Sequence, residues 1–152
     1  MTNMMRASLL QAATSTFEEL TFLMPSERLD ERQANASLAA EARVDFSGPM
    51  NGSLLVRVHG ELMPVLAARM LGANAPGPIL ERDALGEIAN VLCGNVLPKI
   101  AGGAAVFSLR SPAVTNGIVA PPPPAAPAAA VTLGLDCGRV EVMLSVDSDA
   151  RA

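Results

Sequence analysis

The sequence has no Trp and no Tyr, only four Phe residues, and a single histidine, His59. With so few aromatic side chains, the core has to be built from Leu, Val, Ile, Ala and Met, and close packing has to supply its stability. Aromatic side chains that could stack on bases are missing, and the 11 basic residues form no block that could follow a phosphate backbone. The sequence therefore predicts no nucleic-acid partner.

Cysteine is also scarce. Cys93 and Cys137 lie far apart, lack a CxxC spacing and have only His59 as a further soft or nitrogen ligand, so we expect no metal site. The pair is typical of reduced thiols in a cytoplasmic protein, although a disulfide between them stays open at this stage. His59 has no partners for a catalytic triad, which favours a structural or surface role.

Targeting and nucleotide-binding motifs are absent as well. No apolar stretch of signal-peptide length opens the chain, and the apolar segment 117–135 contains four consecutive prolines, Pro121 to Pro124, that a membrane-spanning helix could not accommodate. The sequence has no GxSxG elbow, P-loop or dinucleotide-binding fingerprint. We expect neither export nor a membrane segment, and no hydrolase, kinase or dehydrogenase of those kinds.

The sequence does contain enough apolar residues to form one hydrophobic core. A chain of 152 residues, half of them hydrophobic, predicts a single domain over 1–152. Helical spacing of apolar residues over 4–24 predicts an N-terminal helix within 1–25, which Pro25 ends. Residues 26–40 are polar and predict a loop with at most a short helical turn, and the Pro/Ala-rich stretch 120–130 predicts an extended surface loop.

Alternating apolar residues predict strands in three regions. A hairpin is expected over 42–58, two strands over 105–110 and 114–119, and a second hairpin over 131–146 with its turn at 136–138. Helical spacing returns over 61–71 and again over 80–101. This order of elements predicts an α+β fold in which helices pack on an antiparallel sheet.

The helix expected over 80–101 has two different faces. On a helical wheel its large apolar residues gather on one side, which predicts that this side is buried. The opposite side is predicted to form one outward stripe, which consists of Asp83, Gly86, Glu87, Asn90 and Gly94. The two glycines each cost about 0.5–1 kcal/mol relative to Ala in a helix, a cost that makes sense if the surface of a partner must come close.

Glu87 and Asn90 are the pair with chemical potential in this stripe. Residues three apart on a helix are neighbours, so their side chains project together. A carboxylate can pair with a lysine of a partner, and an amide can both donate to and accept from a water molecule. The bland alternative is a solvated helix face, with Asp83 as a first-turn acid stabilised by the helix dipole.

The run Asp83-x-x-x-Glu87-x-x-Asn90, followed by Pro112 a little over twenty residues on, resembles the signature of the CheC/CheX/FliY chemotaxis phosphatases. The order of elements is similar over most of the chain, from the leading helix with FEELTFLM to the closing antiparallel sheet. The similarity is greatest to CheX-like members.

This resemblance implies a cytoplasmic phosphatase that acts in trans on the aspartyl phosphate of a CheY-type response regulator. By the resemblance, Asn90 orients the attacking water and Glu87 pairs with the active-site lysine of the receiver, while Asp83, Gly86 and Gly94 contact the partner. No cofactor of its own is implied, because the receiver holds the phosphate and its Mg²⁺. The alternatives are a non-catalytic docking or flagellar switch-like module of the same fold and an unrelated scaffold domain.

Two departures from the family pattern carry expectations of their own. CheC-like members have a second motif on the first helix, but here Glu18 and Glu19 are followed three residues later by Thr21 and Phe22, so we expect a single active site. Pro98 predicts a kink beyond the motif. A homodimer is left open by the sequence.

Overall fold

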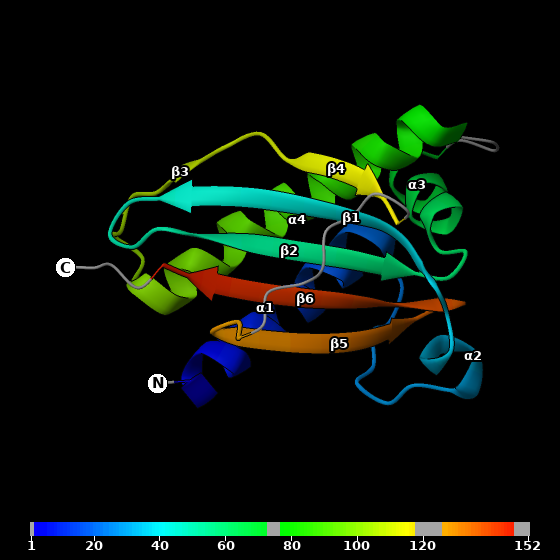
Figure 1. Ribbon diagram of the computed structural model, residues 1–152, viewed down its shortest axis with the longest axis horizontal. Helices are drawn as coiled ribbons and strands as arrows, with labels where there is room; N and C mark the ends of the chain where they lie inside the picture. Colours follow the sequence, from blue (N-terminus) through cyan, green and yellow to red (C-terminus); the bar gives the residue numbers. More distant parts are fainter. Residues whose placement is uncertain (1, 73–76, 118–125, 148–152) are drawn as a thin grey trace.

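The computed structural model describes residues 2–72, 77–117 and 126–147, in which the two long helices lie on one face of an antiparallel sheet (Figure 1). The helices are α1 (Thr2–Thr21), α2 (Glu31–Ala34), α3 (Met63–Leu71) and α4 (Gly77–Ala101). The strands are β1 (Leu38–Ser47), β2 (Gly52–His59), β3 (Ser108–Leu109), β4 (Ala113–Asn116), β5 (Ala129–Leu135) and β6 (Gly138–Val146). The predicted α+β class is confirmed.

The sheet has the strand order β3-β1-β2-β6-β5, and β4 also pairs with β1. Its register lines up buried apolar residues across four strands. Ala42 lies opposite Val56 on β2, and Val56 lies opposite Val142 on β6. Val131 on β5 continues this row, so the strands present one continuous apolar face to the helices.

That face is covered by α1 and α4, which cross behind the sheet in Figure 1. Leu9 and Phe17 from α1 and Leu85, Ile88 and Leu92 from α4 are fully buried against it. Because both helices bury large side chains in the same core, neither can turn about its axis without exposing apolar surface. The core therefore sets which side of α4 faces outward.

The end of α1 is fixed by a side chain rather than by Pro25. The hydroxyl of Thr21 donates to the carbonyl of Phe17 at 2.6 Å, and its oxygen accepts the backbone N–H of Leu23 at 3.2 Å. Phe22 between them has a left-handed backbone with φ 61°, which ends the helix. The helix predicted to reach residue 24 therefore stops at Thr21.

Other boundaries differ from the sequence-based expectation in similar small ways. The loop predicted over 26–40 is shorter, because α2 forms with a capping box between Asp30 and Gln33 and β1 begins at Leu38. The strands predicted over 105–110 and 114–119 shrink to β3 and β4, with residues 118–119 outside the described chain. Within the Pro/Ala-rich stretch 120–130, β5 already begins at Ala129, and residues 120–125 are not described. Helix α4 runs on past Pro98 to Ala101.

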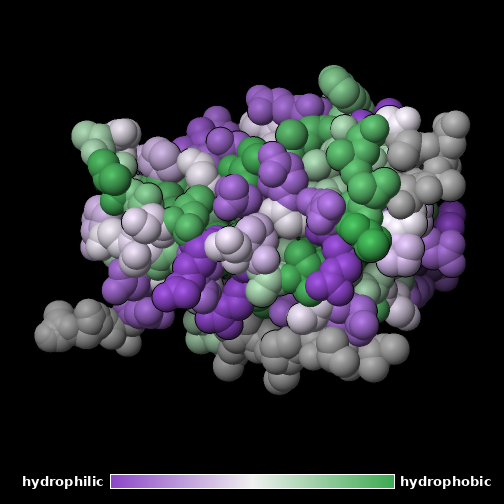
Figure 2. Space-filling view, turned by 90° about the horizontal axis from the view of Figure 1, so that it is seen from above, coloured by the Kyte–Doolittle hydropathy of each residue, from purple (hydrophilic) through white to green (hydrophobic). Residues whose placement is uncertain are grey.

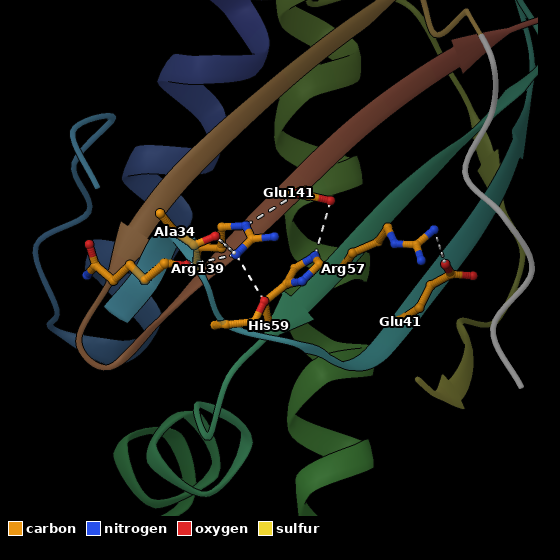
Figure 3. A network of polar contacts seen from close by, with 8 residues as sticks. Ala34, Glu41, Arg57, His59, Arg139 and Glu141 are labelled. Carbon is orange, nitrogen blue, oxygen red and sulfur yellow. Dashed lines mark hydrogen bonds and ion pairs between the residues drawn. The ribbon is translucent and has the colours of Figure 1, made fainter. Parts of the chain in front are cut away.

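Arg139 fastens α2 to the sheet (Figure 3). Its Nη1 donates to the backbone oxygens of Gln33, Ala34 and Ala36 at 2.7, 3.1 and 3.1 Å. Its Nε lies 3.4 Å from Oε2 of Glu141, whose Oε1 lies 3.2 Å from Nε2 of the buried His59. His59 thus belongs to a polar network at the base of α2, in line with the structural role predicted for it.

A second ion pair lies beside this network. Nη1 of Arg57 is 3.3 Å from Oε1 of Glu41, and both side chains are almost fully buried. Burial raises the pKa of Glu41 above its ordinary value, and the opposing effects of Arg57 and Arg43 do not cancel this. The free-energy cost of removing the two charges from water offsets their attraction. The presence of this ion pair is therefore weak evidence that it stabilises the fold.

The two cysteines are free thiols, as the sequence favours. Burial raises the pKa of the Cys93 thiol to about 12, so the thiolate that would react or bind a metal is not populated near neutral pH. Cys137 is partly buried, and its sulfur contacts the backbone oxygen of Glu61 at 3.2 Å.

The Glu141 contacts predict a pH-dependent contribution to stability. The hydrogen bond with His59, supported by the charges of His59 and Arg139 and opposed by burial, lowers the pKa of Glu141 below its ordinary 4.5. A lowered acid pKa stabilises the fold above the unfolded-state value, and this contribution is lost as pH falls through the folded-state pKa. Glu141→Gln should therefore lower the free energy of unfolding at pH 7 by about 1 kcal/mol.

Urea unfolding of both proteins at pH 7 and near pH 3.5 measures this effect. The gap between wild type and Glu141→Gln should narrow at the lower pH, whereas the exposed-site control Asp147→Asn should show little change at either pH. A gap that stays constant or widens on acidification would contradict the assignment.

Candidate functional site

Helix α4 presents Glu87 and Asn90 on the side turned away from the core. Leu85, Ile88 and Leu92 on the opposite side are 0% exposed, whereas Glu87 is exposed and Asn90 is partly exposed. Three residues apart on one helix, the carboxylate and the amide project from adjacent positions. The structure therefore brings together the two residues that the sequence singled out and leaves both accessible.

The pair lies in a shallow hollow with a volume of about 440 Å³. The residues that line it come from α4 and from the segment around β4: Arg82, Asp83, Gly86, Glu87, Asn90, Pro112 and Val114. Pro112, which the signature places 22 positions after Asn90, forms part of the opposite wall. The spacing of the motif in sequence thus corresponds to two sides of one hollow.

Gly86 does not belong to the outward surface, contrary to the sequence-based prediction. It is buried, and a methyl group added at its Cα would lie 3.6 Å from Cβ of Pro112 and 3.7 Å from Cγ2 of Val114. These are ordinary contact distances, so the position is covered by the chain itself. The helical wheel could not show this, because the covering residues come from a distant segment.

Gly94 is exposed as predicted, and an added methyl group would meet nothing within 4 Å. No steric demand within the described chain explains a glycine at this point in a helix, where it weakens the helix by about 0.5–1 kcal/mol relative to Ala. Gly94 lies one turn beyond Asn90, on the same outward side.

Asp83 and Arg82 form the N-terminal rim of the hollow. Because α4 begins at Gly77 rather than near Leu80, Asp83 lies beyond the first turn, and the reading of Asp83 as a first-turn acid is wrong. Nη2 of Arg82 donates to the backbone oxygen of Val114 at 3.0 Å. This bond ties α4 to β4 and holds the arginine at the wall.

The functional groups of Asp83, Glu87 and Asn90 are free to engage a partner. Within residues 2–72, 77–117 and 126–147, none of the three side chains makes a hydrogen bond or ion pair. An accessible carboxylate next to an accessible amide can receive a cation and align a water molecule, respectively. Among the described residues, no His, Cys, Ser, Thr or Lys side chain lines this hollow, so the only groups in it that could act as a base are the carboxylates of Asp83 and Glu87.

Sequence reasoning missed two lining residues, Arg82 and Val114. Arg82 precedes Asp83 directly, but its sequence context does not reveal that its side chain reaches β4. The sequence predicts Val114 in a strand, but the pattern of residues does not indicate that this strand lies beside α4.

The first helix carries no equivalent pair. Thr21 is fully buried, and its hydroxyl is bonded to the carbonyl of Phe17. Phe22 has no polar group to orient water. The positions three residues after Glu18 and Glu19 therefore present no accessible amide of the kind that Asn90 presents on α4.

The part of the chain that the structure describes shows neither a ready-made metal site nor a helix suited to a membrane span. No group of three or more His, Cys, Asp or Glu in this part of the chain is arranged to hold a metal ion. Among the helices described, none combines the length and the hydropathy that a membrane span requires.

Comparison with known families identifies the class. The family model for "Chemotaxis phosphatase CheX" matches residues 40–118, a stretch that contains most of β1, all of β2, α3 and α4, and Pro112. The chain belongs to this family. No curated protein matches the chain.

Solved structures share the fold at low sequence identity. A chemotaxis protein CheX from Desulfovibrio desulfuricans is 18% identical, with a TM-score of 0.73 over 94% of this chain and 99% of that one. CheX in a CheX–CheY–BeF3–Mg²⁺ complex from Borrelia burgdorferi is 17% identical, with a TM-score of 0.64 over 93% and 97% of the two chains. The middle domain of FliM from Vibrio alginolyticus is 13% identical, with a TM-score of 0.56 over 95% and 91%.

The open space around Gly94 predicts opposite effects on stability and on partner contact. Gly94→Ala should raise the free energy of unfolding by about 0.5–1 kcal/mol, because alanine is the better helix former. If a partner packs on this side of α4, the added methyl group should weaken that complex. Thermal unfolding measures the stability of the variant. On the same preparation, the rate at which a phosphorylated receiver loses its phosphate in the presence of the variant measures the effect on partner contact. A variant that is less stable than wild type would contradict the open environment of Gly94.

Proposed function

We propose that this protein is a phosphatase that accelerates loss of phosphate from the aspartyl phosphate of a CheY-type response regulator. The observation that supports it is the unpaired Glu87–Asn90 pair in an open hollow on a helix whose other side is fixed in the core. Membership of the CheX family and a structural neighbour solved with CheY point to the same partner class.

In this mechanism Asn90 acts on water. Its amide accepts one hydrogen bond from the attacking water through Oδ1 and leaves the oxygen lone pair of that water directed at phosphorus. Phosphoryl transfer needs in-line positioning of the attacking oxygen more than covalent chemistry from the protein. Holding the water on a fixed helix reduces the entropy that the transition state would otherwise lose.

Glu87 acts on the receiver. Its carboxylate would pair with the lysine ammonium of the receiver active site in a charge-assisted hydrogen bond, which fixes the distance between Asn90 and the phosphorus atom. The receiver would supply the aspartyl phosphate and the Mg²⁺ that neutralises its charge, and this chain would need no cofactor of its own. We assign contacts around this pair to Asp83 and Gly94, and to Gly86 only through Pro112, which covers it.

A second candidate is a docking module of the same fold without catalysis. The similarity to the middle domain of FliM favours it, because that domain shares the fold without being a CheX protein. This alternative predicts that the phosphorylated receiver binds but decays at its own rate. The two functions are therefore separated by one kinetic measurement.

Asn90→Ala tests the mechanism. Losing a positioned polar group should lower the stimulated rate of dephosphorylation by about 10²-fold or more, with little change in stability because the side chain makes no bond within the described chain. Loss of acyl phosphate from a panel of phosphorylated receivers, with and without the protein, provides the rate.

Asn95→Ala is the matched control. Asn95 is an exposed asparagine on the same helix, outside the hollow, and its amide donates to the hydroxyl of Thr16 at 3.0 Å. This variant should keep the stimulated rate while losing some stability. Equal rates for wild type and Asn90→Ala would end the proposed mechanism, and a wild-type protein that binds without stimulating decay would select the docking module.

A further inference from the structure

Glu87 and Asp83 stand on a ridge between two hollows, of which the site described above is only one. The other has a volume of about 440 Å³ and lies on the side of the ridge toward α1 and α3. Three helices line it: Glu19 and Leu20 from α1, Met70 and Leu71 from α3, and Asp83, Ala84 and Glu87 from α4. We call it the α1–α3 hollow.

The α1–α3 hollow combines apolar walls with an acidic rim. Leu71, at the last position of α3, is 47% exposed, and Leu20 and Met70 are partly exposed. Glu19, Asp83 and Glu87 line the same hollow, and none of the three has an ion-pair partner among the described residues. Figure 2 shows apolar side chains exposed toward the end of the molecule where α3 and the start of α4 lie.

The residue that follows α1 has an unusual feature of its own. Phe22, two residues after Leu20, is 75% exposed and has a left-handed backbone. That conformation is unfavourable for a residue other than glycine by about 1–2 kcal/mol, and an exposed aromatic ring gains nothing from the core. The contacts of Thr21 hold Phe22 in this exposed position.

We propose that the α1–α3 hollow is a docking site for the same receiver, which inserts an apolar side chain flanked by basic groups. The proposal rests on the proposed function and extends it from the reacting pair to the surface that selects the receiver. Its first argument is continuity, because Asp83 and Glu87 line both hollows, so a protein that reaches Glu87 also covers this one.

The second argument is charge. Three unpaired carboxylates around an apolar floor would repel an acidic surface and attract a basic one, and such complementarity governs partner choice and association rate. Contact on both sides of the ridge would also fix the rotation of the receiver about Glu87, on which the alignment of the water depends. Leu71 and Glu19 are then specificity-determining residues rather than catalytic ones.

Leu71→Glu tests the docking site, with Val106→Glu as the matched control. Both changes place a carboxylate at an exposed apolar position, but Val106 is 82% exposed in the loop before β3 and lines neither hollow. The probe is each receiver of the panel, loaded with beryllofluoride and Mg²⁺, and its dissociation constant is measured by calorimetry. Leu71→Glu should weaken binding at least tenfold and raise KM with little change in kcat, whereas Val106→Glu should match wild type in all three.

Glu19→Lys is a second variant that tests the acidic rim without altering the apolar floor. It should lower the association rate severalfold at low salt and by less at high salt, because exposed charges are screened. An unchanged rate at low salt would contradict the charge argument. Circular dichroism and thermal unfolding show that each variant is folded.

The outcomes separate this proposal from the proposed function. Unchanged affinity in Leu71→Glu, with catalysis lost in Asn90→Ala, overturns the docking site and leaves the phosphatase intact. Weakened binding in Leu71→Glu, with no stimulation of decay by wild type, supports the docking site and ends the phosphatase. No binding to any receiver overturns both. Loss of a dimer in Leu71→Glu without any change in receiver affinity assigns the hollow to a second copy of the chain and overturns the proposal.

Discussion

The burial of one side of α4 is the constraint on which the rest of this structure depends. Leu85, Ile88 and Leu92 are fully enclosed between α1 and the sheet, and exposing any of them would cost about 1.5–3 kcal/mol. This burial fixes the rotation of the helix about its axis. The side chains opposite the core are consequently fixed in direction without needing any polar bond of their own.

This arrangement explains how an accessible pair can be positioned without contacts. Glu87 and Asn90 make no hydrogen bond within the described chain, so neither has to break an internal bond before it meets a partner. Their placement comes from the helix backbone beneath them and from the bond that joins Arg82 to β4 at 3.0 Å. Under the proposed function, the carboxylate and the amide come from this chain, and the phosphate and the metal ion would come from the receiver.

The polar network of Arg139, Glu141 and His59 joins elements other than those that carry the site. Arg139, Glu141 and His59 secure α2 and its flanking loop to the sheet. They stabilise the end of the sheet next to α2, whereas α4 is held mainly by apolar packing, to which the bonds of Arg82 and Asn95 add.

The sequence by itself determined the fold class, the existence of the long helix and the outward direction of Glu87 and Asn90. These follow from the spacing of apolar residues along one chain segment, which local reasoning can read. Only the tertiary structure decided that Gly86 is covered by Pro112 and Val114, that Arg82 reaches β4, and that α1 and α3 build a second hollow beside Glu87. Each of these depends on which distant segments meet, and that is set by the packing of the whole core, not by the local pattern of any one segment.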